Sequence, residues 1–408
     1  MTANNQVLDF DSSVVDEIVE KIGVTATACK EKGNNPFEAI DIVRESRLGA
    51  VRVPLAEGGS GWSMPQYFDM LMRLAAADSD VAQILRAHFW FTEERLRSPD
   101  QSVRKRWLSR VVAGEIFGNA ATEIGGSSAI GSFVMNTTLT PAENGYILDG
   151  TKYYCTGSLF SDWVMVLAST PEGGTTNVVV PVKRDGVTLE DDWDGVGQRF
   201  TGSGTGHFKQ VHVNEEEVLW QMGFDEENTE ESPTEPYFIG QFVQLILTAT
   251  IVGNMKRASQ EAAEIVRSRK RSFTHASEER PAADPQFQEI VGRIAAATFA
   301  AESAVLAAAT AQQKALDTVE NGLGDFDLTH RASLLSAQAK VFADDVAPKL
   351  ATQLFELGGA SSTVRERGLD TYWRNIVTLA AHNATAFKAR AVGDTLVNGV
   401  ELPMNAYF

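Results

Sequence analysis

Few side chains of this sequence have the spacing of a recognised catalytic motif. None of the six histidines forms an HxxxH pair or lies within a few residues of a second Cys-type ligand, so we predict no metal site. The run at residues 202–206, GSGTG, matches a serine nucleophile elbow only loosely, because no helical pattern follows it. Neither a P-loop nor a strand–GxGxxG–helix unit occurs. These patterns disfavour metal-dependent catalysis, acyl transfer, ATP hydrolysis and nicotinamide binding on a Rossmann unit.

Polar residues instead gather in three segments, at 118–128, 150–158 and 191–199. They lie among short runs of β-branched and aromatic residues between residues 116 and 219, for example at 163–167. Strands of this length, separated by turns, predict a compact antiparallel β domain. The polar segments therefore lie in and beside a β domain.

Helical patterns flank this β region. Between residues 11 and 114, apolar residues recur at a spacing of 3.6, first behind the polar start Asp11-Ser12-Ser13. Between residues 236 and 399 the helical segments are long and Ala-rich, and such apolar helices need partners on more than one side. We therefore expect a four-helix bundle that also buries surface between subunits.

The predicted fold class is α+β. We expect an N-terminal α-helical domain at residues 1–115, a middle antiparallel β-barrel or sandwich domain at 116–220, an acidic connector at 221–235 and a C-terminal four-helix bundle at 236–408. The acidic stretch at 215–235 carries nine acidic residues and no basic one. It is interpreted as a solvated connector, and the alternative is an acidic docking surface for a partner.

The whole chain is acidic. Its 408 residues include 36 Lys and Arg against 54 Asp and Glu, a formal net charge of −18. Such a surface repels phosphate backbones and anionic lipids, so we expect neither nucleic-acid nor membrane binding. No uninterrupted apolar run reaches about 18 residues, and the N-terminus lacks a signal-peptide pattern, which predicts a cytoplasmic protein. Cys29 and Cys155 are too few for a disulfide framework and are expected to be small buried residues.

The polar segments resemble motifs of the acyl-CoA dehydrogenase superfamily. Residues 118–128 are similar to its TEP..GSD loop and residues 150–158 to its G.K.W(I/Y)(T/S) loop, and the α-β-α order matches over nearly the whole chain. The resemblance implies that these loops hold the isoalloxazine ring of a flavin against the β domain. Such a ring is bound by amides and hydroxyls at its edge and by an aromatic side chain over its face.

Carried over residue by residue, the resemblance implies that Thr122 and Thr156 bond the edge of the flavin. Tyr154 would cover one face of the ring. Asn119 and Ser158 would lie beside its reactive side.

The C-terminal residues indicate a branch of the superfamily. Its dehydrogenases remove a substrate proton with a glutamate after the last long bundle helix or on the first one, but residues 371–393 and 236–260 contain no acidic residue. Residues 372–399 instead resemble the WRN.RT...HNP..YK.R..G...NG ending of flavin-dependent monooxygenases grouped with dibenzothiophene monooxygenase and sulfur-acquisition oxygenases. Val377 and Ala384 replace the usual Arg and Pro. The resemblance makes His382 a catalytic residue, and His88 likewise matches an active-site histidine of that branch; the alternative for each is a buried core histidine.

Phosphate binding is expected at residues 267–273, RSRKRSF, the most basic run of the chain. This run lies where the superfamily grips the cofactor phosphates, which implies roles for Arg271 and Phe273. Gly359 and Ser361 match a Gly-Gly turn that, in the family, usually reaches the cofactor of a neighbouring subunit. Backbone N–H groups and serine hydroxyls there would complete the site.

These inferences predict a two-component, FMN-dependent monooxygenase. A separate NAD(P)H-dependent flavin reductase would supply reduced FMN, which would react with O2 to a C4a-(hydro)peroxyflavin and oxygenate a small sulfur- or nitrogen-containing substrate. Ser158, Asn119, His382 and His88 would stabilise the adduct and handle its proton. Phe89, Trp90, Phe91 and Trp193 would form a dry pocket. The resemblance also implies a homotetramer.

Two alternatives remain open from the sequence. One is an FAD-dependent acyl-CoA dehydrogenase whose base lies elsewhere. The other is a non-catalytic homologue that acts as a binding protein, with the acidic stretch as its partner surface.

Overall fold

The computed structural model describes residues 7–124, 135–219, 235–319, 324–403 and 408. They pack as two compact units, which are described separately. The first contains Met1–Trp62, Asp80–Asp194 and Arg199–Pro233, and the second contains Ser63–Ser79, Gly195–Gln198 and Thr234–Phe408. The second unit therefore includes residues 63–79, which come from the N-terminal third of the chain. The domain predicted from the sequence had contained all of residues 1–115.

Short helices make up the N-terminal part of the first unit. In α1 the buried residues recur every three or four positions, so one face of the helix is apolar, as the periodicity predicts. α6 begins where the Asp100 carboxylate accepts hydrogen bonds from the N–H groups of Ser102 and Val103. The helices are α1 (Ser13–Glu31), α2 (Phe37–Ser46), α4 (Ser79–Ile84), α5 (Arg86–Leu96) and α6 (Gln101–Val112), with 3-10 turns at Leu48–Ala50 and Leu55–Glu57.

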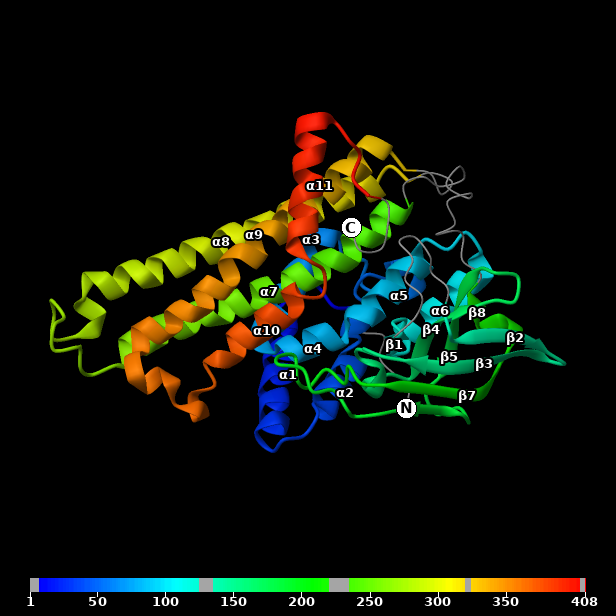
Figure 1. Cartoon of the computed structure of the whole chain (residues 1–408), viewed down its shortest axis with the longest axis horizontal. Coiled ribbons are helices and arrows are strands. Elements are labelled where there is room, and N and C mark those ends of the chain that lie inside the picture. Colours follow the sequence, from blue (N-terminus) through cyan, green and yellow to red (C-terminus); the bar gives the residue numbers. More distant parts are fainter. Residues whose placement is uncertain (1–6, 125–134, 220–234, 320–323, 404–407) are drawn as a thin grey trace. The chain divides into compact units, whose positions relative to one another are not determined.

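A sheet forms the rest of the first unit (Figure 1), with the strand order β6-β7-β3-β2-β4-β5-β8 and β1 paired to β4. Most neighbours are antiparallel, but β1 and β2 each pair with β4 in parallel, so the sheet is mixed and not wholly antiparallel as predicted. The long connection from Ala120 to Trp163 permits a parallel pairing, which a tight hairpin cannot make. The strands are β1 (Phe117–Ala120), β2 (Thr138–Ala142), β3 (Gly145–Lys152), β4 (Trp163–Ser169), β5 (Thr175–Pro181), β6 (Val187–Leu189), β7 (Gly206–Val213) and β8 (Val218–Leu219).

Strand β4 is buried on both faces. Val164 and Val166 lie in a core with Phe208 of β7, whereas Met165 lies in a second core with Trp107 of α6. Because successive side chains of a strand point to opposite faces, a strand covered on both sides needs a continuous apolar run. This explains the uninterrupted apolar sequence of β4. Phe117 of the neighbouring strand β1 belongs to the second core as well.

Three long helices, α7, α8 and α9, lie side by side in the second unit (Figure 1). α3 packs against α7 at Gly253, where an added Cβ would lie 2.3 Å from the Cβ of Ala75. Tyr67 of α3 also stacks on Phe242 of α7. Periodicity identifies the buried face of α3 but not the helix against which that face packs. The helices are α3 (Met64–Ala77), α7 (Glu235–Ser268), α8 (Pro285–Leu316), α9 (Phe326–Gly358), α10 (Asp370–Ala380) and α11 (Thr385–Asn398).

Helices α7 and α8 have the length and mean hydropathy of a membrane span. Neither contains an uninterrupted apolar run of about 18 residues, so the sequence pattern did not predict this. Single polar residues such as Gln241 and Asn254 interrupt the run in α7. The apolar window of α7 is fully buried, which is typical of a core helix, but that of α8 is only 33% buried. Phe299 of α8 is 71% exposed. α8 therefore presents apolar surface outside the unit.

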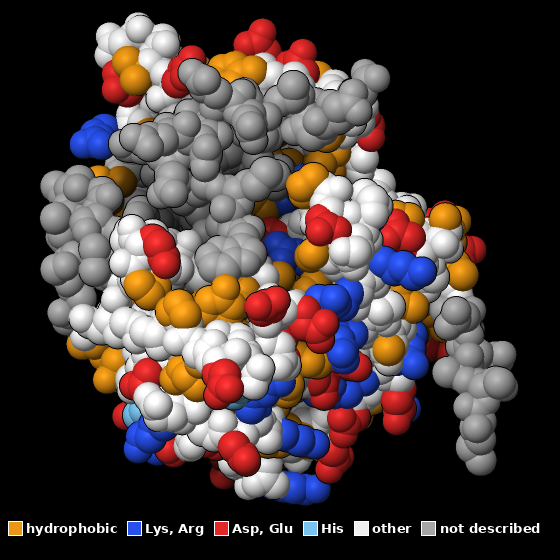
Figure 2. All heavy atoms as spheres, turned by 90° about the vertical axis from the view of Figure 1, so that its right-hand side faces the viewer, with side chains coloured by type: hydrophobic (Ala, Val, Ile, Leu, Met, Phe, Trp, Pro, Cys, Tyr) orange, Lys and Arg blue, Asp and Glu red, His pale blue; other side chains and the backbone are white. Residues whose placement is uncertain are grey.

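Charged side chains of both signs share the surface, and Figure 2 shows them interspersed on one face. The start of the acidic stretch is paired: Glu217 accepts hydrogen bonds from Arg184, and Glu216 lies 3.2 Å from Arg106. These two acidic residues are thus bound to their own unit. The connector predicted at 221–235 lies outside the described residues, except for Glu235 at the start of α7.

Candidate active site

Two predicted site residues of the sheet unit meet at Ser158. This buried residue begins the 3-10 turn Ser158–Phe160, and its Oγ donates a hydrogen bond to the main-chain oxygen of Asn119, 3.0 Å away. Gly118 permits the approach, because a Cβ there would lie 2.5 Å from Ser158 Oγ. Among the described residues, none hydrogen-bonds the side-chain amide of Asn119, which is therefore available to a ligand.

Tyr154 and Trp193 form an exposed aromatic pair. Tyr154 has a left-handed backbone (φ 56°) and is 53% exposed, and its ring meets that of Trp193 edge-on with centroids 5.9 Å apart. Left-handed residues other than glycine are uncommon and cluster at functional sites. The structure thus joins a residue predicted to cover a flavin face to one predicted to line the pocket, and their rings offer a platform for a planar ligand.

Thr156 follows Tyr154 closely in the chain, and its hydroxyl group belongs to a cluster with two hydroxyl groups of the loop at residues 201–203. Thr156 Oγ1 is 2.8 Å from Ser203 Oγ, which is 2.7 Å from Thr201 Oγ1. Thr122 is exposed, and its main-chain oxygen accepts a hydrogen bond from Tyr153 N–H (2.8 Å). This bridge joins the two segments that the resemblance assigns to the edge of the flavin.

A buried ion pair fixes the Thr122 segment to β3. Lys152 Nζ lies 2.7 Å from Glu123 Oε1, with the side chains 0% and 5% exposed, and it also donates to Ala121 O. Burial raises the pKa of Glu123, but hydrogen bonds from Lys152 and from main-chain N–H groups, including that of Asn136, outweigh it and lower the pKa to about 2. Glu123 is therefore ionised. Neither residue was predicted from the sequence to have a role in the site.

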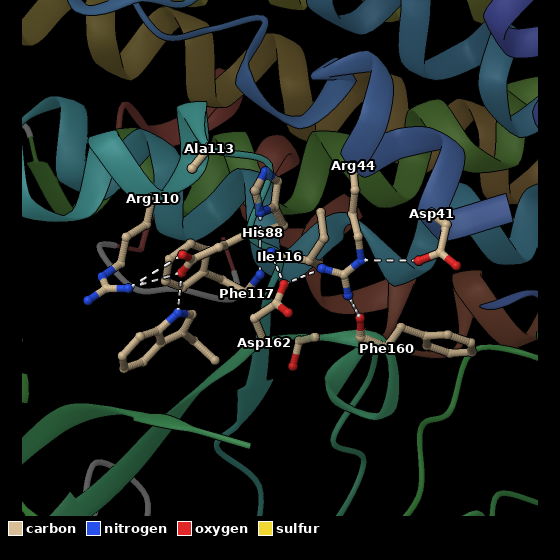
Figure 3. A network of polar contacts seen from close by, with 12 residues as sticks. Asp41, Arg44, His88, Arg110, Ala113, Ile116, Phe117, Phe160 and Asp162 are labelled. Carbon is tan, nitrogen blue, oxygen red and sulfur yellow. Dashed lines mark hydrogen bonds and ion pairs between the residues drawn. The ribbon is translucent and has the colours of Figure 1, made fainter. Parts of the chain in front are cut away.

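A polar network supports the strand and the turn that carry Asn119 and Ser158 (Figure 3). Arg44 binds the Asp162 carboxylate and donates to Phe160 O at the end of the Ser158 turn. Asp162 accepts a hydrogen bond from Ile116 N–H (2.8 Å), directly before β1. One arginine–carboxylate pair thus holds both the turn and the strand in place. Neither Arg44 nor Asp162 carries a local sequence signal, because the two lie far apart in the chain.

His88 is buried in this structure, and its predicted catalytic role stays a prediction. Its ring is 0% exposed, with Nε2 3.0 Å from Gly49 O and Nδ1 accepting from Phe117 N–H at 3.4 Å (Figure 3). Both nitrogens therefore bond main-chain atoms here. Burial, reinforced by the charge of Arg44, outweighs the bond to Gly49 and lowers the pKa of His88 to about 4. The ring is neutral and helps hold α5 against β1.

The three aromatic residues of α5 that were predicted to line the pocket pack in the core of the sheet unit, and their role in a pocket stays a prediction. Phe91 is 0% exposed and stacks on Phe117 with centroids 4.0 Å apart, so it is a core residue. Trp90 packs against the same core, and its Nε1–H donates to Glu94. Phe89 is fully buried beside the His88 ring. The run HFWF is apolar on every face of the helix, so the sequence could not distinguish core positions from pocket positions.

The neutral state of His88 makes stability depend on pH. Below about pH 6.5 the His88 imidazole is protonated in the unfolded chain, but in the folded protein it stays neutral down to about pH 4. The free energy of unfolding therefore falls as pH drops through this window, by up to about 3 kcal/mol. In His88→Gln this contribution is absent. We expect the gap in unfolding free energy between wild type and variant, measured with urea from pH 7.5 to 5, to narrow as pH falls. A gap independent of pH would contradict a histidine held neutral.

His382 lies in the second unit, in the short loop between α10 and α11. Its side chain is exposed, which rules out the buried core histidine considered from the sequence. Its main-chain N–H donates to Leu379 O, and the next residue, Asn383, lies 3.5 Å from Gln244 Oε1 of α7. The loop thus presents an imidazole from a position fixed at the end of a helix.

A candidate anion site lies where α7 ends. Arg269 donates to Leu357 O (2.6 Å), and its guanidinium stacks on Phe273, 4.4 Å from the ring centroid. Gly359 passes against Phe273, where a Cβ would lie 2.8 Å from the ring. The predicted Phe273 and Gly359 therefore lie directly against each other, and Arg269, a residue that the sequence did not single out, stacks on Phe273. The predicted Arg271 is exposed.

Two serine hydroxyls near this cluster in the chain lack partners. Ser272 Oγ and Ser362 Oγ are buried without a hydrogen bond among the described residues, whereas the predicted Ser361 bonds Gly358 O (2.9 Å). Ser272 lies three residues from Arg269 in the chain, and Ser362 lies five residues from Leu357, which Arg269 contacts. Buried hydroxyls without a partner fit an anion that would satisfy them. The donor set thus suits a phosphate group.

A further unpaired group, Gln241, was missed from the sequence. It is 0% exposed on α7, and neither amide atom bonds a described residue. It lies one helical turn before Gln244, whose amide contacts Asn383 in the His382 loop. A buried primary amide normally bonds a polar partner, so a ligand with an oxygen or nitrogen atom fits here.

Comparison with known protein families agrees with the sequence motifs. The N-terminal, middle and C-terminal domains of acyl-CoA dehydrogenase match residues 7–115, 118–211 and 245–387, respectively. The chain therefore belongs to the acyl-CoA dehydrogenase superfamily, and the predicted family and fold are confirmed.

Several relatives that match over nearly the full length are named as monooxygenases. The chain is 29% identical to dibenzothiophene monooxygenase of Mycolicibacterium goodii, over 97% of this chain and 96% of the relative. It is 26% identical to the probable FMNH2-dependent monooxygenase SfnC of Pseudomonas putida, over 95% and 94%. The crystal structure of FMN-bound TdsC from Paenibacillus sp. A11-2 superposes with a TM-score of 0.88 at 28% identity, covering 97% of this chain and 99% of that one.

Proposed function

We propose that this chain is an FMN-dependent monooxygenase that uses O2 to oxygenate a small sulfur- or nitrogen-containing substrate. The observation that carries the proposal is the exposed His382 in the loop after α10, together with a first long bundle helix whose polar residues at 236–260 include no carboxylate. A dehydrogenase of this superfamily would need a carboxylate at one of these positions. The similarity to full-length monooxygenases supports the same function.

We assign roles in FMN binding to each unit separately. In the sheet unit, the Tyr154–Trp193 pair would pack against a flavin ring. In the helical unit, Arg269, Ser272 and Ser362 would hold a phosphate group. When bound in reduced form, FMN supplies the electrons that activate O2. The Ser158 hydroxyl is directed at Asn119 O, which leaves the Asn119 amide to hydrogen-bond the ligand.

His382 would hold and return the proton that an oxygen transfer requires. An imidazole can do this near neutral pH, which suits it better than a carboxylate. Gln241 would hydrogen-bond an oxygen or nitrogen atom of the substrate. His88, buried and neutral, would act only through the packing of β1.

We also propose a partner enzyme, a compartment, a metabolic role and an oligomeric state. Reduced FMN would come from a separate NAD(P)H-dependent flavin reductase, which makes this chain one half of a two-component system in the cytoplasm, acting in sulfur metabolism. The exposed apolar face of α8 would be covered by further copies of the chain in a homotetramer, because an apolar surface of this kind is stabilised by an interface.

Oxygen incorporation tests the proposal directly. Purified protein, FMN, NADH and a flavin reductase are incubated in air with sulfides, sulfones, thiophenes and amines, and products are weighed by mass spectrometry. We expect a product heavier by one oxygen atom, FMN as the bound cofactor, and no dehydrogenation of acyl-CoA thioesters with an artificial electron acceptor. Turnover of thioesters with bound FAD would establish the dehydrogenase instead, and a protein that takes up no flavin would establish the binding protein.

A further inference from the structure

Helix α9 contains a buried ion pair that none of the site assignments above uses. Lys340 and Asp344 lie one helical turn apart, with Nζ and Oδ2 2.6 Å apart and side chains only 2% and 4% exposed. Removing two charges from water is costly, and their mutual attraction offsets the cost only if further hydrogen bonds complete the pair. The partners of those additional bonds therefore indicate what the pair does.

Both additional partners belong to the ends of the His382 loop. Lys340 Nζ donates to the main-chain oxygen of Ala380, the last residue of α10, at 3.3 Å. Asp344 Oδ2 accepts from the hydroxyl of Thr385, the first residue of α11, at 2.5 Å. The four residues between them, 381–384, include His382.

We propose that Lys340 and Asp344 are positioning residues that clamp both ends of the His382 loop and so fix where its imidazole is presented. This inference rests on the proposed function for its catalytic consequence, but not for the clamp itself. Oxygen transfer needs the proton-handling group within a few tenths of an ångström of its place, so a loop released at either end loses that place.

The contacts also explain why Asp344 is not the missing base of a dehydrogenase. Its Oδ2 already accepts from both Lys340 and Thr385, and a third charged group, the buried Lys388, lies close enough to be stabilised by its charge. The pKa of Lys388 is lowered to about 7 by burial and by Lys340, against the effect of Asp344. Both contacts of Oδ2 are structural, so the Asp344 carboxylate is engaged in holding the two loop ends.

The same helix offers a matched control. Asp345 and Lys349 form an ion pair of the same spacing, 2.9 Å long, but their side chains are 69% and 70% exposed. Exposed pairs of this kind contribute little. Asp345→Asn removes the same charge one residue away without touching the loop.

Two readouts test the clamp. The first is product formed per reduced FMN oxidised, with the remainder appearing as hydrogen peroxide. We expect Asp344→Asn to lower this coupling at least tenfold while its affinity for reduced FMN stays within about twofold, and Asp345→Asn to match wild type. Thr385→Val releases one end only and should lower coupling about threefold, whereas Thr385→Ser keeps the hydroxyl and should restore it.

The second readout needs neither substrate nor flavin. Amide hydrogen exchange at residues 381–384 should accelerate in Asp344→Asn and Thr385→Val but not in Asp345→Asn. Unchanged exchange in folded Asp344→Asn would overturn the clamp, as would full coupling. If Asp344→Asn does not fold, Thr385→Val against Thr385→Ser decides alone. Faster exchange in a protein that oxygenates nothing would uphold the clamp and reject the proposed function.

Discussion

Replacing His382 by alanine should reduce oxygenated product at least 100-fold while reduced FMN still binds with a Kd within about twofold of wild type. General acid–base catalysis by one side chain contributes about 10²–10⁴-fold, which sets the size of the effect. The imidazole is exposed on a loop and belongs to no core, so its removal should leave the fold intact. Product is measured by mass spectrometry and flavin binding by anaerobic titration.

The control for this variant is His212→Ala. His212 is also exposed but lies on β7 of the sheet unit, far from the His382 loop in sequence. It should leave product formation unchanged. The two variants should also differ in hydrogen peroxide, because electrons from reduced FMN that are not used to form product would reduce O2 to peroxide. Wild-type product yield from His382→Ala would reduce this residue to a structural role.

The second large effect is expected at Arg269. Arg269→Ala should weaken the binding of reduced FMN by about 10–100-fold, since a charge-assisted hydrogen bond to a phosphate contributes about 1.5–3 kcal/mol. Arg269→Lys should restore only part of the affinity, because an ammonium cannot reproduce the planar stacking on Phe273. The measurement is an anaerobic fluorescence titration.

Two neighbouring arginines serve as comparisons. Arg267 is exposed at the end of α7, and its Nε–H bonds its own helix, so Arg267→Ala should bind FMN as wild type does. Arg271 is the residue selected from the sequence, and its exposed side chain leads us to expect a smaller loss than at Arg269. Equal losses in all three variants would indicate a general effect of positive charge and not a built phosphate site.

Short-range patterns gave the most dependable part of the sequence analysis. The order of helices and strands follows from local periodicity, and Asn119, Ser158, Thr122 and Tyr154 lie in loops whose spacing is readable within a few residues. The structure brings Asn119 to Ser158, and Thr122 to the segment of Tyr154. Both cysteines are buried as predicted, and burial raises the pKa of Cys155 to about 12, so it is a thiol.

The sequence did not predict contacts between residues that lie far apart in the chain. The sequence could not show that His88 would find Gly49 and Phe117 for its two nitrogens, and so it could not separate a core histidine from a catalytic one. The same holds for the basic run, where Arg269 and not Arg271 stacks on Phe273. In both cases the sequence correctly indicated which segment carries the relevant side chains. It did not show where each side chain points, because that depends on contacts with residues distant in the chain.

The packing of α3 on α7 has a consequence for biogenesis. α3 ends at Ala77, but α7, the helix against which it packs at Gly253, ends at Ser268 and is completed about 190 residues later. At about 5–20 residues per second, the apolar side chains of Tyr67, Phe68 and Leu71 are without this partner for roughly 10–40 s. During that interval the apolar face of α3 is exposed and can bind chaperones or associate with other nascent chains. The yield of soluble enzyme therefore depends on translation speed and chaperone supply as well as on the stability of the finished fold.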